Sequence, residues 1–384
     1  MDIGLKALWE RVPIYLGECY PIVVCAIGGL VIGLLAKRIG PYPEDLSEVM
    51  AKVRRDRRYE YRDLGKISVG AILPLVFGGS VGPEAGLSGV IAALCTWVGD
   101  RLKRIGKELG EMSVLGMYAT LSAIFSAPLL GVYLSAEKGD AAPESNGISK
   151  AMKIMACIAA VIGAVGAFYL LSKYIGGGLS LPYYSHMEHG LDELMWLIPI
   201  ALVAAFAGWI FLVLSASIKF AVGKYLKGKE LPMCAAAGLI LGISGVLLPF
   251  TMFAGETQAA ELNEVWVGMS AGLLLATGFV KVAVSAMCVN MGWRGGHLFP
   301  LIFSAIAIGY GLASVIGIDP AFCLCVCSAA LMGAALRKPV MAILLLFLCF
   351  PLQGAIIMAI PAVIGAYLPL PEFVRKNLSE RNQS

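Results

Sequence analysis

Long apolar runs, separated by short polar connections, dominate the pattern of this chain. The runs 151–171, 194–222 and 231–250 reach the roughly 20 residues that a helix needs to cross a bilayer. Shorter runs lie near glycine or proline, and these are 67–77, 87–98, 112–124, 129–136, 301–316, 320–336 and 340–350. Interrupted helices occur at membrane depth only where the freed backbone groups face protein or a polar cavity. The pattern therefore predicts an all-α, multi-pass membrane protein with broken helices.

Composition agrees with this assignment. Of 384 residues, 59% are hydrophobic and 15% are charged, and the mean hydropathy is +0.81. A water-facing surface cannot hide that much apolar side chain, so the lipid bilayer is the expected surrounding. The net charge of +4 is small and the basic residues lie mainly in short connections, which argues against a nucleic-acid partner.

Catalytic chemistry and bound cofactors are not predicted. The ten cysteines lie almost entirely in apolar runs and lack the paired spacing of a zinc or redox site. With three histidines and no His-Glu-x-x-His pattern, an intramembrane enzyme or a metal site is disfavoured. We interpret the cysteines as small buried hydrophobic residues.

Positive charge predicts how the chain is oriented. Seven basic residues lie between Lys52 and Lys66, and short basic connections stay in the cytoplasm, which would place residue 1 outside. We divide the chain into an N-terminal segment (1–19), a first transmembrane half (20–138), a linker (139–150), the remaining transmembrane helices with the second half (151–368) and a polar C-terminal tail (369–384).

One carboxylate stands at the start of an apolar helix. Gly82 suits the cap position and Pro83 the first helical position, which puts Glu84 in the first turn among unpaired backbone amides. These amides and the summed peptide dipoles attract anions. The functional interpretation is that Glu84 occupies an anion site and leaves it when protonated. The alternative is an ordinary helix start whose acid caps its own amides.

A lysine inside an apolar run also needs explaining. Lys281 lies within 265–288, and a charge at membrane depth is costly enough to indicate function, with an anion as a candidate partner. Alternatively, the flexible stem of Lys281 carries its ammonium group to the membrane interface.

The two halves of the chain repeat one order of features. Gly82 begins a helix and Pro128 restarts one, while Gly295 and Pro339 repeat that order at nearly the same separation. Paired broken helices in corresponding positions indicate an inverted-repeat transporter whose site lies at the interface of the repeats.

Four motifs in order resemble the CLC family of chloride channels and proton-coupled chloride transporters. Residues 82–86 (GPEAG) resemble the family's Gly-Arg-Glu-Gly-Pro element, and residues 296–300 (GHLFP) resemble its Gly-x-Phe-x-Pro element. Residues 126–129 (SAPL) are similar to Asn-Ala-Pro-Leu, and residues 337–339 (RKP) match Arg-x-Pro. Together they cover most of the chain, from about residue 20 to residue 350.

The resemblance implies particular site residues. Glu84 takes the place of the family's gate, and the anion-binding candidates are Gly82, Pro83, Ala85, Gly296, His297, Leu298, Gly40 and Tyr42. Gly40 stands where the family has a serine whose hydroxyl helps to hold the anion. The family's inner proton-relay glutamate aligns with Lys138, and the neighbouring Glu137 is the candidate relay.

Transport of a small anion, chloride first, is the function that the sequence predicts. The pore would be gated by Glu84, with protons as the second substrate of a chloride/proton antiporter. The alternatives are a passive, proton-uncoupled anion channel and a transport-inactive scaffold or sensor. The resemblance also implies a homodimer in the plasma membrane.

Overall fold

The structure is a computed structural model that describes most of the chain. The described residues are 8–9, 17–40, 44, 46–56, 58–102, 116, 118–120, 122–123, 125, 127–136, 150–175, 183–184, 186–187, 190–347 and 349–383. Within these ranges the regular elements are helices, and the only extended pairing is an isolated antiparallel bridge between Gly82 and Gly296. The predicted all-α fold is confirmed.

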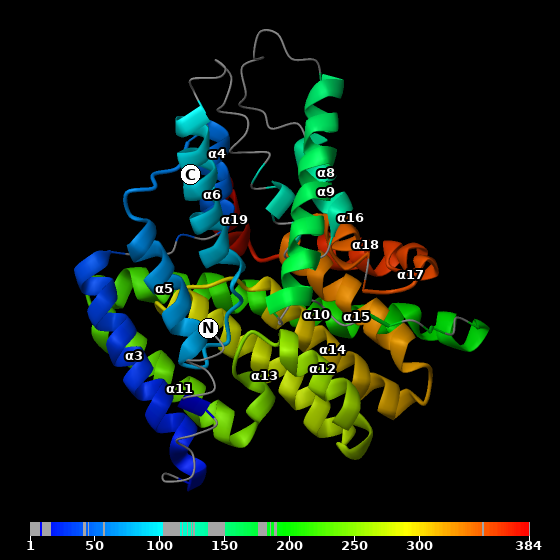
Figure 1. Ribbon diagram of the computed structural model, residues 1–384. Helices are drawn as coiled ribbons and strands as arrows, with labels where there is room; N and C mark the ends of the chain where they lie inside the picture. Colours follow the sequence, from blue (N-terminus) through cyan, green and yellow to red (C-terminus); the bar gives the residue numbers. More distant parts are fainter. Residues whose placement is uncertain are drawn as a thin grey trace.

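The helices follow the order in Figure 1. The chain begins with η1 (Gly17–Cys19), α3 (Tyr20–Ile39), α4 (Leu46–Asp56), α5 (Leu64–Val76), α6 (Glu84–Leu102), α8 (Pro128–Ala136) and α9 (Lys150–Ile175). Then come α10 (Leu191–Tyr225), α11 (Glu230–Leu247), η2 (Pro249–Thr251), α12 (Glu256–Val265), η3 (Trp266–Gly268), α13 (Ala271–Asn290), α14 (Leu298–Ile316) and α15 (Pro320–Leu336). The chain ends with α16 (Pro339–Leu346), α17 (Leu352–Ile357), α18 (Ala359–Tyr367) and α19 (Glu372–Gln383).

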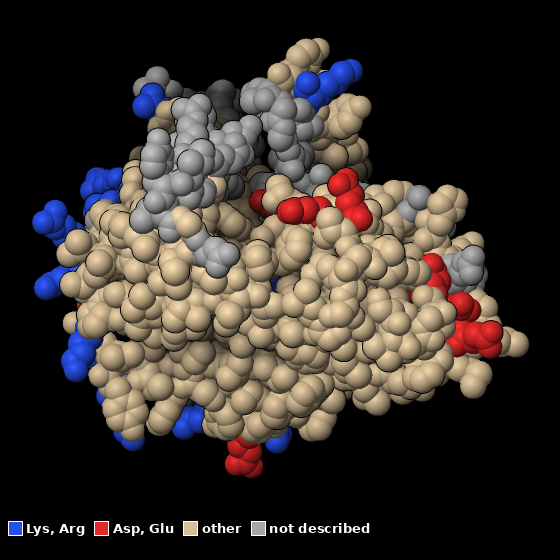
Figure 2. All heavy atoms as spheres, turned by 90° about the horizontal axis from the view of Figure 1, so that it is seen from below, with Lys and Arg blue, Asp and Glu red and all other residues tan. Residues whose placement is uncertain are grey.

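Five of the described helices are long and apolar enough to cross a membrane: α3, α10, α11, α13 and α14. They expose large apolar side chains, among them Leu34 on α3, Phe206 on α10 and Leu247 on α11. Charged side chains lie mostly at the rim of the face shown in Figure 2, and its middle is largely uncharged. Such an apolar surface is suited to lipid, and we conclude that the chain is an integral membrane protein.

Buried helices form the centre of the molecule. Most side chains of α14 and α15 are buried, and these two helices pack against each other and against α10, α13 and α18 (Figure 1). Cys323, Cys325 and Cys327 on α15 are fully buried, as small hydrophobic residues would be. At the edge of the molecule, Gly238 and Gly242 let α11 lie directly on the backbone of α3, because a methyl group at either position would overlap it.

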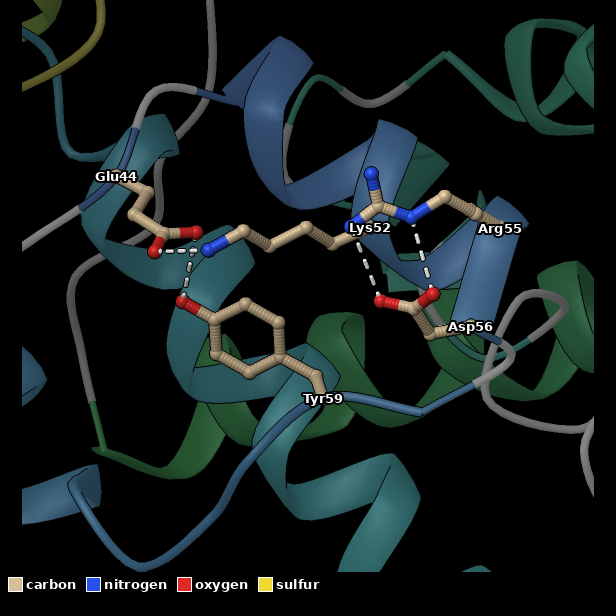
Figure 3. A network of polar contacts seen from close by, with 5 residues as sticks. All are labelled: Glu44, Lys52, Arg55, Asp56 and Tyr59. Carbon is tan, nitrogen blue, oxygen red and sulfur yellow. Dashed lines mark hydrogen bonds and ion pairs between the residues drawn. The ribbon is translucent and has the colours of Figure 1, made fainter. Parts of the chain in front are cut away.

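Ion pairs and hydrogen bonds attach the basic connection of the first half to α6. Lys52 on α4 pairs with a Glu44 carboxylate oxygen at 2.5 Å, and the Tyr59 hydroxyl donates to the same carboxylate (Figure 3). The Tyr59 amide donates to Thr96 on α6, at 3.0 Å, and Arg58 pairs with Asp100 near the end of that helix, at 2.7 Å. The cytoplasmic side expected for this connection stays a prediction.

Three segments that polarity marked as connections or a tail are helices. Val49 and Val53 bury one face of α4, Ala259 and Leu262 bury one face of α12, and Val374 anchors α19 in the segment predicted to be a polar tail. A narrow apolar stripe is enough to hold such a helix in place when other segments pack over it. Averaging polarity along the chain does not detect a stripe this narrow. The predicted run 265–288 is likewise divided, since α13 begins only after the Ser270 cap.

Candidate functional site

The first break lies between α5 and α6. Gly78 adopts a left-handed conformation (φ 80°), and the Gly79 amide turns back to donate to the Pro74 carbonyl at 2.7 Å. Ser80 is fully buried, and its hydroxyl lies 2.9 Å from that of Ser285 on α13. The chain therefore enters α6 from a buried segment, and α6 begins at Glu84, one residue after the Pro83 start that the glycine-proline pattern predicted.

The second break lies between α13 and α14. Gly292 is left-handed (φ 91°), and the buried Trp293 indole donates to the Cys234 carbonyl on α11 at 2.9 Å. His297 precedes the helix and stacks on Phe211 of α10, with ring centroids 5.2 Å apart. Leu298 is the first residue of α14. Both breaks thus deliver a helix N-terminus into the protein interior.

The two breaks bind each other and enclose the acid. Each amide of the pair Gly82 and Gly296 donates to the carbonyl of the other, at 2.7 Å. Glu84 is fully buried, and its Oε1 accepts a hydrogen bond from the Leu298 amide, also at 2.7 Å. A methyl group at either paired position would overlap the Glu84 carboxyl group, so the two glycines leave the space that this carboxyl group fills. The Glu84 carboxylate therefore occupies the N-terminus of α14.

The predicted anion-binding residues divide into two groups. Pro83, just before α6, and Ala85, in its first turn, are buried next to the paired Gly82, and His297 directly precedes α14. Gly82 and Gly296 were expected to offer their amides to an anion. Each amide instead donates to the carbonyl of the other glycine, so neither is an open donor. The amide seen on an anionic group is that of Leu298.

Gly40 lies in a different environment. It caps the C-terminus of α3, with φ 95°, and does not precede a helix start. Its amide donates to the Ala36 carbonyl, so this amide is not the predicted anion donor. The residue lines a cavity of about 490 Å³ together with Lys66, Lys227 and Arg294. Tyr42 and Glu137, with Lys138, lie outside the described residues.

Lys281 is fully buried, which excludes the alternative that its ammonium group reaches the membrane interface. Its Nζ donates to the carbonyls of Phe250, Met252 and Phe253 at 2.7 to 3.1 Å, and to Oε1 of Gln258 at 3.2 Å. The ammonium group also lies 4.5 Å from the Phe303 ring centroid, a cation–π contact. Protein oxygens therefore take the place of the predicted anion partner.

The sequence analysis missed Glu256. It is the first residue of α12 and follows Gly255, which is left-handed (φ 100°). α12 is not one of the five spanning helices, and burial raises the pKa of Glu256 to about 7, with a smaller contribution from the charge of Glu84. A signal was present, because Gly255-Glu256 repeats the pattern of glycine followed by an acid at a helix start.

These features define a class of membrane protein in which broken helices meet at a buried acid. The family model described as voltage gated chloride channel matches residues 28–369. The chain therefore belongs to the voltage gated chloride channel (CLC) family, and the resemblance seen in its motifs is confirmed.

Curated relatives agree with this assignment. A protein of Escherichia fergusonii named "Putative ion-transport protein YfeO" is 27% identical over 329 residues, which is 82% of this chain and 74% of the relative. A protein of the same name from Shigella flexneri matches with the same identity and the same coverage.

Solved structures share the fold. A slow cyanobacterial Cl⁻/H⁺ antiporter superposes with a TM-score of 0.79 at 17% identity, covering 100% of this chain and 92% of that one. A eukaryotic CLC transporter gives 0.72 at 15% identity, with coverages of 99% and 70%. A CLC-type fluoride/proton antiporter gives 0.64 at 15% identity, with coverages of 92% and 96%. At these identities the likeness concerns the fold alone.

Proposed function

We propose that this protein moves a small anion, chloride first, across the plasma membrane through a path that Glu84 closes. The hydrogen bond from the Leu298 amide to Glu84 Oε1 carries this proposal. A carboxylate there stands in for an anion, because both are negative acceptors for the same amide at the positive end of the α14 dipole. Two proteins that share this fold are a Cl⁻/H⁺ antiporter and a fluoride/proton antiporter, which supports an anion as substrate.

Protonation of Glu84 is the opening step. A neutral carboxyl group is a weaker acceptor than a carboxylate, so the Leu298 amide becomes available to an anion from solution. Because backbone amides provide the attraction, the path holds the anion without a fixed positive charge that would trap it. The buried, glycine-lined contact between the breaks leaves no room for both the side chain and another group at this place. Anion and carboxylate therefore exclude each other.

Replacement of Glu84 by glutamine tests the gate. In liposomes loaded with chloride, wild-type efflux should rise by up to about tenfold per pH unit on acidification, as expected for one titrating group. The Glu84→Gln protein should show efflux that changes by less than about twofold between pH 5 and pH 8, because glutamine carries no titrating proton. An unchanged pH dependence in this variant would remove Glu84 from the gate.

Proton flux decides between antiporter and channel. We place chloride/proton antiport first, since the acid that closes the path carries a proton whenever it opens. An imposed chloride gradient should then drive protons uphill in vesicles. Chloride efflux without uphill proton movement would instead assign a passive channel. No chloride efflux, with anion-dependent thermal stabilisation retained, would assign a transport-inactive sensor.

A homodimer is part of the proposal and rests on the family. Its test is the mass of the purified protein in detergent, measured by light scattering and corrected for bound detergent. A monomeric mass combined with full transport activity would argue against a functional dimer.

A further inference from the structure

A cavity of about 490 Å³ lies between the ends of four helices. The C-terminal ends of α3 and α10 and the N-terminal parts of α5 and α11 line it, together with the start of the second break. Its volume falls within the range of about 300–1,000 Å³ that is typical of small-molecule sites. Neither Glu84 nor Leu298 lines it, so the cavity is separate from the meeting point of the two breaks.

The cavity lies at one surface of the membrane. α3 and α11 lie side by side (Figure 1) and run in opposite directions. A methyl group at Gly33, near the end of α3, would lie 2.8 Å from the Leu231 Cα at the start of α11, and at the other end of the pair Gly242 lies equally close to Ile22. The 20 residues of α3 give a length of about 30 Å, the thickness of the hydrocarbon core. The end of α3 and the start of α11 therefore reach the same membrane boundary, with the cavity between them.

Basic side chains dominate the charged part of the lining. Among the described residues around the cavity, Lys66, Lys227 and Arg294 are basic and Glu230 is the one acid. Lys66 also pairs with Asp63 at 2.7 Å, just outside the lining. Lys66 and Lys227 are exposed, and Arg294 is half-buried. The last turns of α3 and α10 add further positive charge, from Lys37, Arg38 and Lys224. The cavity therefore attracts an anionic group.

Apolar side chains form the part of the cavity that reaches into the membrane. Ile32 lies about two turns before the end of α3, and Leu73 lies about two and a half turns after the start of α5. Lys66, by contrast, lies in the first turn of α5, and Lys227 follows the end of α10. Because the charge lies at the boundary and the apolar surface lies deeper, the matching ligand has an anionic head and an apolar tail. A small inorganic anion would leave the apolar wall unused.

The second break forms one wall of the cavity. Gly292 and Arg294 both line it, and the buried Trp293 between them is fixed to the Cys234 carbonyl of α11 by its indole, at 2.9 Å. Arg294 precedes Gly296, one half of the glycine pair, by two residues. A ligand held by Arg294 therefore contacts the segment that leads into α14.

We propose that this cavity binds the headgroup of an anionic phospholipid and that the bound lipid supports transport by fixing the second break. Basic pockets between membrane helices bind acidic headgroups in other membrane proteins. Arg294 and Lys227 donate charge-assisted hydrogen bonds to the phosphate, and an acyl chain lies along the apolar wall at Ile32 and Leu73. The lipid site stands on the cavity alone, whereas its effect on transport rests on the proposed function.

Thermal unfolding of the purified protein in detergent tests the binding. Added phosphatidylglycerol should raise the unfolding temperature, because it combines a net negative charge with acyl chains. Phosphatidylcholine of the same chain length, which has no net charge, and inorganic phosphate, which has no chain, should not.

Variants at the rim of the cavity locate the site. Lys227→Gln should weaken the apparent affinity for phosphatidylglycerol by about tenfold, the size of one lost hydrogen bond between charged groups. Lys227→Arg should keep most of the affinity. Lys173→Gln, which removes an exposed lysine on α9, is the matched control and should bind as wild type.

Chloride efflux tests the effect on transport. Wild-type efflux should be about tenfold faster from phosphatidylcholine liposomes that contain phosphatidylglycerol than from pure phosphatidylcholine liposomes, a coupling of ordinary size. Lys227→Gln should lose most of this gain, and Lys173→Gln should keep it. Because these two variants have the same net charge and lie in the same membrane, the surface potential of the liposomes does not explain a difference between them.

Three binding results would overturn the lipid site. They are equal stabilisation by phosphatidylglycerol and phosphatidylcholine, equal stabilisation by inorganic phosphate, which assigns the cavity to a soluble anion, and an affinity that Lys227→Gln leaves unchanged. Specific binding with no effect on efflux would overturn the role of the lipid in transport. A protein without chloride efflux in either membrane would contradict the proposed function, and the binding measurement would still decide the lipid site.

Discussion

The two breaks at the centre of the molecule are alike in backbone and opposite in chemistry. Each follows a left-handed glycine, Gly78 in one and Gly292 in the other, and each ends in the first turn of a buried helix. The first places a carboxylate at that turn, in Glu84, and the second presents the apolar Leu298, whose amide binds that carboxylate. The repeat therefore supplies two similar helix starts, and one side chain makes their meeting point switchable by a proton.

This asymmetry separates scaffold from switch. The mutual amide pairing of Gly82 and Gly296 holds the breaks together through backbone atoms alone and uses no atom of the Glu84 side chain. The contact between Glu84 and Leu298 is the one that a proton weakens. Changes to the scaffold should therefore alter stability, and changes to the space around Glu84 should alter gating.

Lys281 gives the largest expected effect and tests the scaffold of the first break. Lys281→Met leaves the buried carbonyls of Phe250, Met252 and Phe253 without their shared donor, at about 1–3 kcal/mol for each group left unsatisfied. The free energy of unfolding should fall by about 3 kcal/mol or more, measured by denaturant titration in detergent. Lys219→Met, at an exposed position on α10, is the control and should change it by less than about 0.5 kcal/mol. Equal stability of the two variants would show that the buried ammonium group does not hold this loop.

Gly296→Ala tests the space around Glu84 from the second break. The added methyl group overlaps the Glu84 carboxyl group, and the flexible acid is the part that can move. Chloride efflux at neutral pH should rise by about tenfold, equal to about 1.4 kcal/mol, and depend less on pH. Gly82→Ala should act in the same direction, because it meets the same carboxyl group from the first break.

Gly272→Ala is the matched control, since nothing lies within 4 Å of the added methyl group. A stably folded Gly296→Ala protein with wild-type efflux and an unchanged pH profile would show that Glu84 does not block the path from this position.

The hydroxyl pair between the breaks has the smallest expected effect. Ser80 lies in the first break, just before Glu84, and Ser285 lies on α13, the helix that leads to the second break. Ser285→Ala should lower the free energy of unfolding by about 1 kcal/mol, because it leaves a buried hydroxyl without its partner. The double variant with Ser80→Ala should cost less than the sum of the single changes. Additive costs in this double-mutant cycle would mean that the two hydroxyl groups do not act together.

Local stereochemistry explains which features could be predicted from the sequence. The helix starts at Glu84, Pro128, Leu298 and Pro339 follow from the preferences of glycine and proline, which act over a few residues. The membrane assignment follows from run lengths in the same way. These features needed no knowledge of how distant segments pack.

The remaining features depend on contacts between distant segments. Gly82 and Gly296 pair through backbone groups, and backbone carbonyls accept the hydrogen bonds of Lys281. Every residue has these groups, so the amino-acid sequence does not indicate which of them will meet. The run lengths did not predict α12 because its apolar stripe is short, and Glu256 was missed with it. The sequence therefore predicted the gate acid but neither its backbone surroundings nor the second acid.

The central claim is that Glu84 and the transported anion compete for the amide of Leu298. The most direct measurement is a crystal structure of the Glu84→Gln protein grown in bromide, with anomalous scattering used to locate the ion. We predict a bromide peak within hydrogen-bonding distance of the Leu298 nitrogen, with the glutamine side chain moved away. Well-ordered glutamine in the position of Glu84, with bromide bound elsewhere and none at this amide, would contradict the account.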